Sequence, residues 1–181
     1  MNSLGRGIGS LGLSPDIWTV IGFVFAVTAG LLYGFKPSMP YLAALAIVTS
    51  GVMDMLDGAA ARAMRKVSKT GSFNDSTLDR LAEVAIFAGI VYGGYSISPV
   101  FCVLALGFSL LVSYTRAKGD ALSVTLSGIG IGERAERLIV LIVFSIIGYV
   151  NYGVYIVLIL AFVTFVQRYV FIYRKLNARP V

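Results

Sequence analysis

Apolar stretches separated by short polar breaks organise this sequence. The breaks carry proline, glycine or clustered charges, and the apolar stretches cover residues 17–34, 41–63, 72–95, 101–115, 133–149 and 154–173. A helix needs about 20 apolar residues to cross a hydrocarbon core of about 30 Å, and these segments account for nearly the whole chain. The pattern therefore predicts an all-α integral membrane protein with six transmembrane helices.

Composition supports this prediction and excludes an ordinary soluble protein. Of the 181 residues, 57% are hydrophobic and only 13% are charged, whereas soluble domains carry about 25% charged residues. The length suits a single domain over residues 1–181. Residues 1–13 are rich in glycine and serine with leucine and isoleucine at helical spacing, so we expect an interfacial segment there. Ser14 and Pro15 then give the N-cap and first turn of a helix.

The distribution of basic residues predicts the orientation in the membrane. The net charge is +6, but lysine and arginine cluster at the ends of the apolar stretches, where anionic lipid headgroups rather than nucleic acid are the expected partners. Of the fifteen basic residues, only Lys36 falls on the side that holds the first, third and fifth turns. By the positive-inside rule both termini then face the cytoplasm. The single cysteine, Cys102, excludes an intrachain disulfide.

Four aspartates stand at membrane depth, where ionised side chains are costly. Asp54 and Asp57 are three residues apart and Asp75 and Asp79 are four apart, so each pair projects from one face of its helix. Two such faces can meet, and four close carboxylates are tolerable only when cations neutralise them. Oxygen ligands in a chain without histidine favour Mg2+ or Mn2+ over zinc, and four carboxylates are enough for two ions. The sequence therefore predicts a metal site on the cytoplasmic side.

Small residues flank this predicted site. Gly58 and the three alanines after it leave a low surface against which a flat or bulky group can lie, and Gly71 allows the next helix to approach closely. The alternative to a metal site is that the four aspartates have a structural role, as helix caps or as partners of Arg62, Arg65 and Arg80. Helix ends do not require this spacing, however.

The run Asp54-x2-Asp57-Gly58-x2-Ala61-Arg62-x8-Gly71-x3-Asp75-x3-Asp79 resembles the full signature of the CDP-alcohol phosphotransferases, integral membrane enzymes of phospholipid synthesis. The resemblance implies that an acceptor hydroxyl attacks the lipid-proximal phosphorus of a CDP-lipid and releases CMP. It implies a homodimer and assigns three roles: metal ligands at Asp54, Asp57 and Asp75, a general base that also touches metal at Asp79, and nucleotide or CDP-lipid binding at Gly58, Ala61, Arg62 and Gly71. The run Pro15-Asp16-Ile17-Trp18-Thr19 is similar to a Pro-Asn-x-x-Thr pattern of the family near the nucleotide pocket, and the departure at Asp16 leaves its role open.

Basic residues at the same predicted rim suggest a phosphate site. A solvated rim of positive-inside charge is the plain alternative. Arginine at the start of a helix runs against the preference of the helix dipole, however, and guanidinium groups bind phosphate oxygens as a bidentate fork. We therefore expect an anionic acceptor, with its phosphate bound by Arg65, Lys66, Arg116, Arg134 and Arg137.

Two segments of the sequence indicate which acceptor alcohol the enzyme uses. Residues 114–118 and 130–138 are similar to those of family members that use inositol phosphate, the archaetidylinositol phosphate and phosphatidylinositol phosphate synthases. This implies CDP-archaeol or CDP-diacylglycerol as the donor and inositol phosphate as the acceptor. Glycerol 3-phosphate or serine is the alternative acceptor, and a divalent-cation channel or transporter is the alternative outside enzymes. Glu83, one turn past Asp79, either orients a metal ligand or pairs with an arginine.

Overall fold

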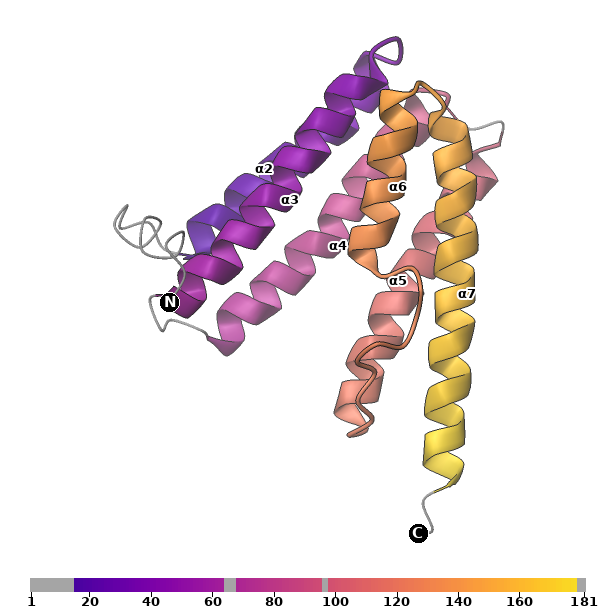
Figure 1. The fold of residues 1–181 in the computed structure, drawn as a ribbon. Coiled ribbons are helices and arrows are strands. Elements are labelled where there is room, and N and C mark those ends of the chain that lie inside the picture. The colour runs from indigo at the N-terminus through magenta and orange to yellow at the C-terminus, as the bar shows by residue number, and fades with distance from the viewer. Residues whose placement is uncertain (1–14, 64–67, 96–97, 179–181) are drawn as a thin grey trace. The chain divides into compact units, whose positions relative to one another are not determined.

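The computed structural model describes residues 15–63, 68–95 and 98–178, and in these residues the chain forms six helices and no strand (Figure 1). The helices are α2 (Pro15–Phe35), α3 (Pro40–Ala63), α4 (Lys69–Tyr92), α5 (Pro99–Ala121), α6 (Arg134–Ile146) and α7 (Val150–Asn177). The all-α fold class with six helices is therefore confirmed. The interfacial segment predicted for residues 1–13 and the predicted N-cap Ser14 lie outside the described residues.

Four helices in the described part of the chain are long and apolar enough to cross a membrane. They supply the stretches Asp16–Phe35, Pro40–Arg62, Pro99–Ala121 and Val150–Asn177. α4 differs because charged residues such as Asp75 and Asp79 stand in its first half. α6 differs because its 13 residues rise only about 20 Å. The long apolar helices expose many large hydrophobic side chains, as expected for surfaces that face lipid.

Some helix ends differ from those predicted. α5 continues to Ala121 rather than ending near Thr115, because no proline interrupts the residues between them. α7 begins at Val150, so residues 151–153, predicted as a turn, form its first turn. The chain reverses instead at Gly148, whose φ of 79° is accessible to glycine without steric cost.

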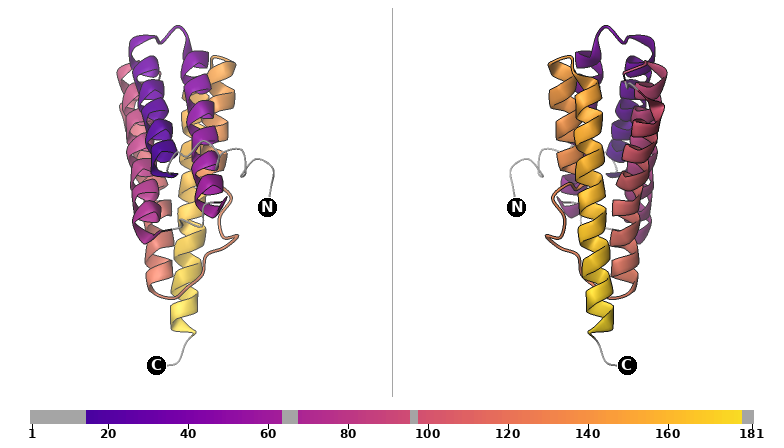
Figure 2. Two further views of the ribbon diagram at one scale, coloured as in Figure 1. Left: turned by 90° about the vertical axis from the view of Figure 1, so that its left-hand side faces the viewer. Right: turned by 90° about the vertical axis from the view of Figure 1, so that its right-hand side faces the viewer.

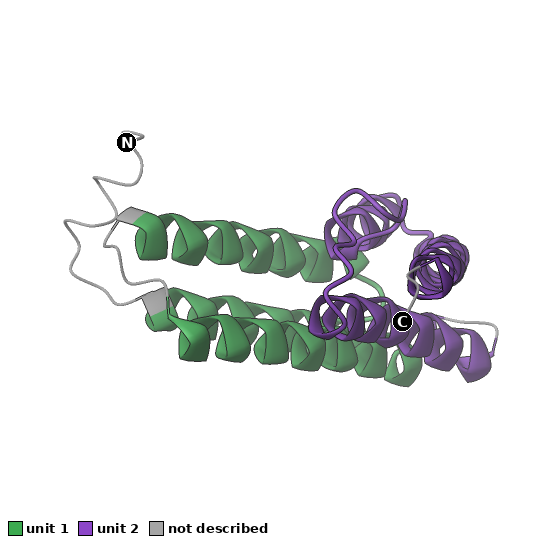
Figure 3. Cartoon of the chain, turned by 90° about the horizontal axis from the view of Figure 1, so that it is seen from below, with its two compact units in different colours: residues 1–93 green, residues 94–181 purple. Residues whose placement is uncertain are grey.

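The chain divides into two compact units, residues 1–93 and residues 94–181 (Figure 3). The single domain predicted over residues 1–181 stays a prediction. In the first unit α2 packs against both α3 and α4. Glycines allow the approach to α4, since a Cβ on Gly89 would overlap the carbonyl oxygen of Gly30 and a Cβ on Gly30 would overlap that of Ala85. Small residues at such contacts are typical of helices that pack in membranes.

In the second unit α7 packs along α5 and against α6 (Figure 2). Gly153 makes the contact with α6 close, because a Cβ there would lie 2.9 Å from the Cβ of Phe144. The segment between α5 and α6 also lies against α7: a Cβ on Gly132 would be 2.8 Å from the Cβ of Leu160. α7 is thus the common support of the second unit, as α2 is of the first.

We expect Gly89→Ala to lower the thermal stability of the detergent-solubilised protein. Alanine is favoured over glycine in a helix by about 1 kcal/mol, but its methyl group would overlap the Gly30 carbonyl, and overpacking costs about 1–3 kcal/mol. Gly51→Ala is the matched control in the same unit, because a Cβ there meets nothing within 4 Å. Thermal unfolding measures both variants, and a midpoint for Gly89→Ala at or above that of the control would contradict the close contact.

Candidate functional site

Three aspartates from two helices gather in the first unit. Asp54 and Asp57 come from α3 and Asp75 from α4, and each offers one carboxylate oxygen within 4.8 Å of the other two. Asp57 is buried and the other two are half-buried. Because α2 packs against both helices, it brings the two acidic faces together. The predicted meeting of carboxylates is therefore present for three of the four aspartates.

The donor set of this trio suits a hard divalent cation. Mg2+ binds oxygen at about 2.0–2.1 Å, so ligand atoms on opposite sides of one ion lie about 4.2 Å apart, which is compatible with oxygens that lie within 4.8 Å of one another. Ionised carboxylates this close repel one another, and the repulsion is strong where water is partly excluded. A cation removes this repulsion. Asp54, Asp57 and Asp75 are therefore the residues that could hold a metal.

Thr19 of α2 adds a hydroxyl group to the trio. Its Oγ1 donates a 2.7 Å hydrogen bond to Oδ2 of Asp57. A hydrogen bond to an ionised acceptor is stronger than one between neutral groups, and partners of this kind orient carboxylates that bind metal. Thr19 belongs to the run of residues 15–19 that is similar to the family pattern, but helical spacing cannot pair it with an aspartate 38 residues away.

Asp79 lies one turn further along α4 than Asp75 and is not a member of the trio. It is half-buried, and its Oδ2 lies 4.0 Å from Nη1 of Arg80, a distance and exposure at which an ion pair contributes little. Glu83 follows one turn later and is buried. Asp79 is thus the carboxylate next to the trio along the helix.

The residues predicted to bind the nucleotide lie close to the trio along α3. Gly58 leaves room for Arg62, since a Cβ on Gly58 would lie 3.3 Å from Nη1 of Arg62. The guanidinium group therefore folds back over the backbone of its own helix. Ala61 is half-buried and adds no bulk there.

Gly71 stands in the first turn of α4, where its N–H donates a 2.9 Å hydrogen bond to the Ser68 hydroxyl that caps the helix. A Cβ on Gly71 would lie 3.6 Å from Oδ1 of Asp16. This is an ordinary van der Waals distance, so Gly71 contacts α2, and the close approach of the two acidic segments at this glycine stays a prediction.

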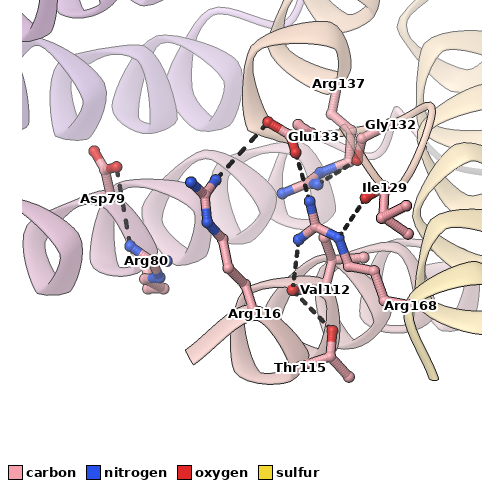
Figure 4. A network of polar contacts seen from close by, with 10 residues as sticks. All are labelled: Asp79, Arg80, Val112, Thr115, Arg116, Ile129, Gly132, Glu133, Arg137 and Arg168. Carbon is pink, nitrogen blue, oxygen red and sulfur yellow. Dashed lines mark hydrogen bonds and ion pairs between the residues drawn. The ribbon is translucent and has the colours of Figure 1, made fainter. Parts of the chain in front are cut away.

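Arginines from α5 and α7 meet one glutamate in the second unit (Figure 4). Glu133, at the start of α6, places Oε2 3.9 Å from Nη1 of Arg116 and Oε1 2.6 Å from Nη2 of Arg168. Arg116 is exposed, whereas Arg168 is only 2% exposed. Phosphate-binding arginines were predicted at the start of α6, and Arg168 is a residue that the prediction did not contain.

Two of the other residues predicted to bind the acceptor phosphate, Arg134 and Arg137, lie within the described part of the chain. Arg137 is buried, and its Nη1 donates a 2.8 Å hydrogen bond to the carbonyl oxygen of Gly132. Arg134 is half-buried in the first turn of α6. Arg65 and Lys66 lie outside the described residues. The structure thus brings Arg116 and Arg137 to one polar cluster around the start of α6 (Figure 4).

Sequence reasoning missed Arg168, although a signal was available. Arg168 stands inside the apolar stretch of residues 154–173. An ionisable residue within a membrane-spanning helix is rare enough to mark function or a buried partner.

Replacing Thr19 by valine should weaken Mn2+ binding about tenfold or more, because removing a hydrogen-bond partner of a metal ligand commonly costs about 10–100-fold in metal affinity. Titration of the purified protein followed by electron paramagnetic resonance measures the affinity. Thr28→Val is the matched control on α2, because that hydroxyl bonds to the Val24 carbonyl of its own helix. Equal Mn2+ affinities in the two variants would remove Thr19 from the site.

Comparison with known proteins supplies the family. The family model for CDP-alcohol phosphatidyltransferase matches residues 13–173. The archaetidylinositol phosphate synthase of Pyrococcus horikoshii is 39% identical over 168 residues, which cover 93% of this chain and 88% of that protein. Two solved structures of the Mycobacterium tuberculosis phosphatidylinositol phosphate synthase, each 26% identical, are also similar. The complex with manganese and citrate has a TM-score of 0.82 and covers 93% of this chain and 87% of its own. The complex with CDP-DAG has a TM-score of 0.79 and covers 93% and 91%.

These matches confirm the predicted resemblance, fold and enzyme class. With the apolar helices of the structure, they identify an integral membrane enzyme. The chain belongs to the CDP-alcohol phosphatidyltransferase family.

Proposed function

We propose that this protein transfers the phosphatidyl or archaetidyl group of a CDP-lipid to a hydroxyl of inositol phosphate and releases CMP. The observation that carries the proposal is the trio of carboxylates within 4.8 Å in a chain of this family. The archaeal relative is named for archaetidylinositol phosphate, and the mycobacterial neighbour is solved with CDP-DAG. Both names agree with a CDP-lipid donor and an inositol phosphate acceptor.

Asp54, Asp57 and Asp75 are the core metal ligands, Asp79 stands next to them, and together they suffice for two ions. Mg2+ or Mn2+ fits these oxygens, and the mycobacterial neighbour is solved with manganese. When bound, the metal neutralises the pyrophosphate and stabilises charge on the departing CMP. Thr19 holds the orientation of Asp57 through its 2.7 Å hydrogen bond. Gly58, Ala61, Arg62 and Gly71 hold the nucleotide.

Asp79 acts as the general base. As the acceptor oxygen bonds to the lipid-proximal phosphorus, Asp79 takes the hydroxyl proton. The bond from that phosphorus to the CMP oxygen breaks, and CMP leaves with the electron pair. The position of Asp79 one turn from Asp75 supports this role. A general base must stand beside the residues that hold the donor, and its own carboxylate must stay available to take the proton.

The acceptor phosphate binds to Arg116, Arg134 and Arg137, with Arg65 and Lys66 as further candidates. Arg116 and Arg137 each act electrostatically on Arg168, and Glu133 lies 2.6 Å from Arg168 and 3.9 Å from Arg116. Guanidinium groups gathered in this way attract an anion. Arginine suits this task because its planar fork matches phosphate oxygens.

The active site and both termini face the cytoplasm in this proposal, and the enzyme works as a homodimer. The positive-inside distribution of basic residues supports the orientation. Exposed tyrosines stand near both ends of α7, at Tyr152 and at Tyr169. Their separation along the helix is about 26 Å at 1.5 Å per residue, which suits aromatic side chains at the two interfaces of one bilayer.

An acceptor panel tests the function. The purified protein, given radiolabelled CDP-lipid and Mg2+, should release CMP with inositol phosphate and much less with glycerol 3-phosphate, serine or free inositol. Chelation of the metal should abolish release. Preference for another acceptor would overturn the inositol phosphate assignment, whereas cation flux in liposomes without CMP release would favour a channel or transporter.

Asp79→Asn should lower the rate of CMP release about 10²- to 10⁴-fold, because general-base catalysis contributes about that factor. The amide keeps the size of the side chain, so CDP-lipid binding and thermal stability should stay near the original values. Asp120→Asn is the control, since this exposed residue lies at the end of α5. Near-normal turnover in Asp79→Asn would remove the proposed base.

A further inference from the structure

Arg168 is a fully buried charge on the apolar helix α7. Its side chain is 2% exposed, and three of its nitrogens are engaged inside the second unit (Figure 4). Nε donates to the Ile129 carbonyl at 2.8 Å, Nη1 to the Val112 carbonyl at 3.0 Å, and Nη2 to Oε1 of Glu133 at 2.6 Å. A buried guanidinium group is tolerated only when its charge and its donors are matched in this way. Arg168 thus joins α5, α7 and the segment of residues 129–133 that leads into α6.

Arg168 is linked to Arg116 through Glu133. Glu133 uses Oε1 for Arg168 and holds Oε2 3.9 Å from Nη1 of Arg116. The buried contact is the short one, so Arg168 fixes the glutamate. The 3.9 Å contact to the exposed Arg116 is weak by itself, so this link draws Arg116 toward Glu133 without fixing its guanidinium group.

Arg168 is linked to Arg137 through the segment of residues 129–133. Thr164, one turn before Arg168 on α7, accepts a 2.8 Å hydrogen bond from the Gly132 N–H, and the Gly132 carbonyl accepts one from Nη1 of Arg137 at 2.8 Å. Gly130, with φ of 115°, packs so tightly on Thr164 that a Cβ would overlap its methyl group. The segment of residues 129–133 is therefore seated on α7 by Arg168 and Thr164 together, and Arg137 is bonded to that segment.

We propose that Arg168 is a positioning residue for the acceptor-phosphate site. It does not contact the acceptor; it seats Glu133 and the segment of residues 129–133. Through that segment it sets the buried Arg137, and through Glu133 it draws Arg116 toward the site. This inference rests on the proposed function, which assigns those two arginines to the acceptor phosphate. Burial of Arg168 excludes it from a solvent-filled site, and convergence of both links on acceptor residues distinguishes it from a general stabiliser.

The experiment compares Arg168→Lys with Arg174→Lys, the same change on the exposed last turn of α7. Lysine keeps the charge but cannot serve three partners at fixed angles. Arg168→Lys should raise the KM for inositol phosphate about tenfold or more, while the KM for CDP-lipid and kcat at saturating acceptor stay within about threefold. Arg174→Lys should change none of these. A loss of stability alone would lower the amount of active enzyme without separating the two KM values.

Thr164→Val keeps the test decisive if Arg168→Lys does not fold. Thr164 is 0% exposed and valine has nearly its shape, so a selective rise in the KM for inositol phosphate would come through the 129–133 segment. In the double variant the two effects should be less than additive, because both changes loosen one segment.

Two results would overturn the proposal: an unchanged KM for inositol phosphate in folded Arg168→Lys or Thr164→Val, or fully additive effects, which would indicate that Arg168 contacts the phosphate itself. Wild-type turnover reports separately on the proposed function. If the unaltered enzyme prefers another phosphorylated acceptor, that assignment fails and the variants are compared with the preferred acceptor instead.

Discussion

Repulsion among three carboxylates is the constraint on which the first unit depends. Asp54, Asp57 and Asp75 hold oxygens within 4.8 Å of one another, and such an arrangement is unfavourable unless a cation neutralises it. The helices meet nonetheless because α2 lies against both of them, and because Gly30 and Gly89 allow backbone contact where side chains would keep α2 and α4 apart. Packing at one end of these helices thus sustains an acidic cluster at the other.

The second unit presents the opposite imbalance. Arg168 is buried against Glu133 at 2.6 Å, a pair in which each charge needs the other because neither is fully hydrated. Arg116 adds positive charge 3.9 Å from the same carboxylate, and Arg137 acts electrostatically on Arg168. The trio of carboxylates therefore attracts a cation, and the arginine cluster of the second unit attracts an anion. The ligands of the proposed reaction, a divalent cation and a phosphate-bearing acceptor, carry these charges.

Local features of this protein could be predicted from sequence and tertiary ones could not. Helical spacing predicted the pairs on α3 and α4, since positions three or four apart share a face whatever the fold. It could not give Thr19, whose partner lies 38 residues away, or the position of Gly71 against α2. Apolar runs located six helices but not the end of α5, because Ala121 and the residues before it suit a helix and a loop equally well by composition. Arg168 escaped because its three partners come from three separate segments.

Charge also bears on which acceptor fits the arginine cluster. A phosphate monoester carries about −1.5 to −2 at neutral pH and is attracted by the guanidinium groups of Arg116 and Arg137, whereas serine has no net charge and gains little from them. Inositol phosphate and glycerol 3-phosphate are alike in this respect, so the arginines select the phosphate and not the alcohol. Choice between the two falls to groups that meet the hydroxyls. Sites that hydrogen-bond a substrate hydroxyl reject analogues without it by about 10⁴- to 10⁵-fold, which is ample for selecting an inositol ring once Arg116 and Arg137 are held in place.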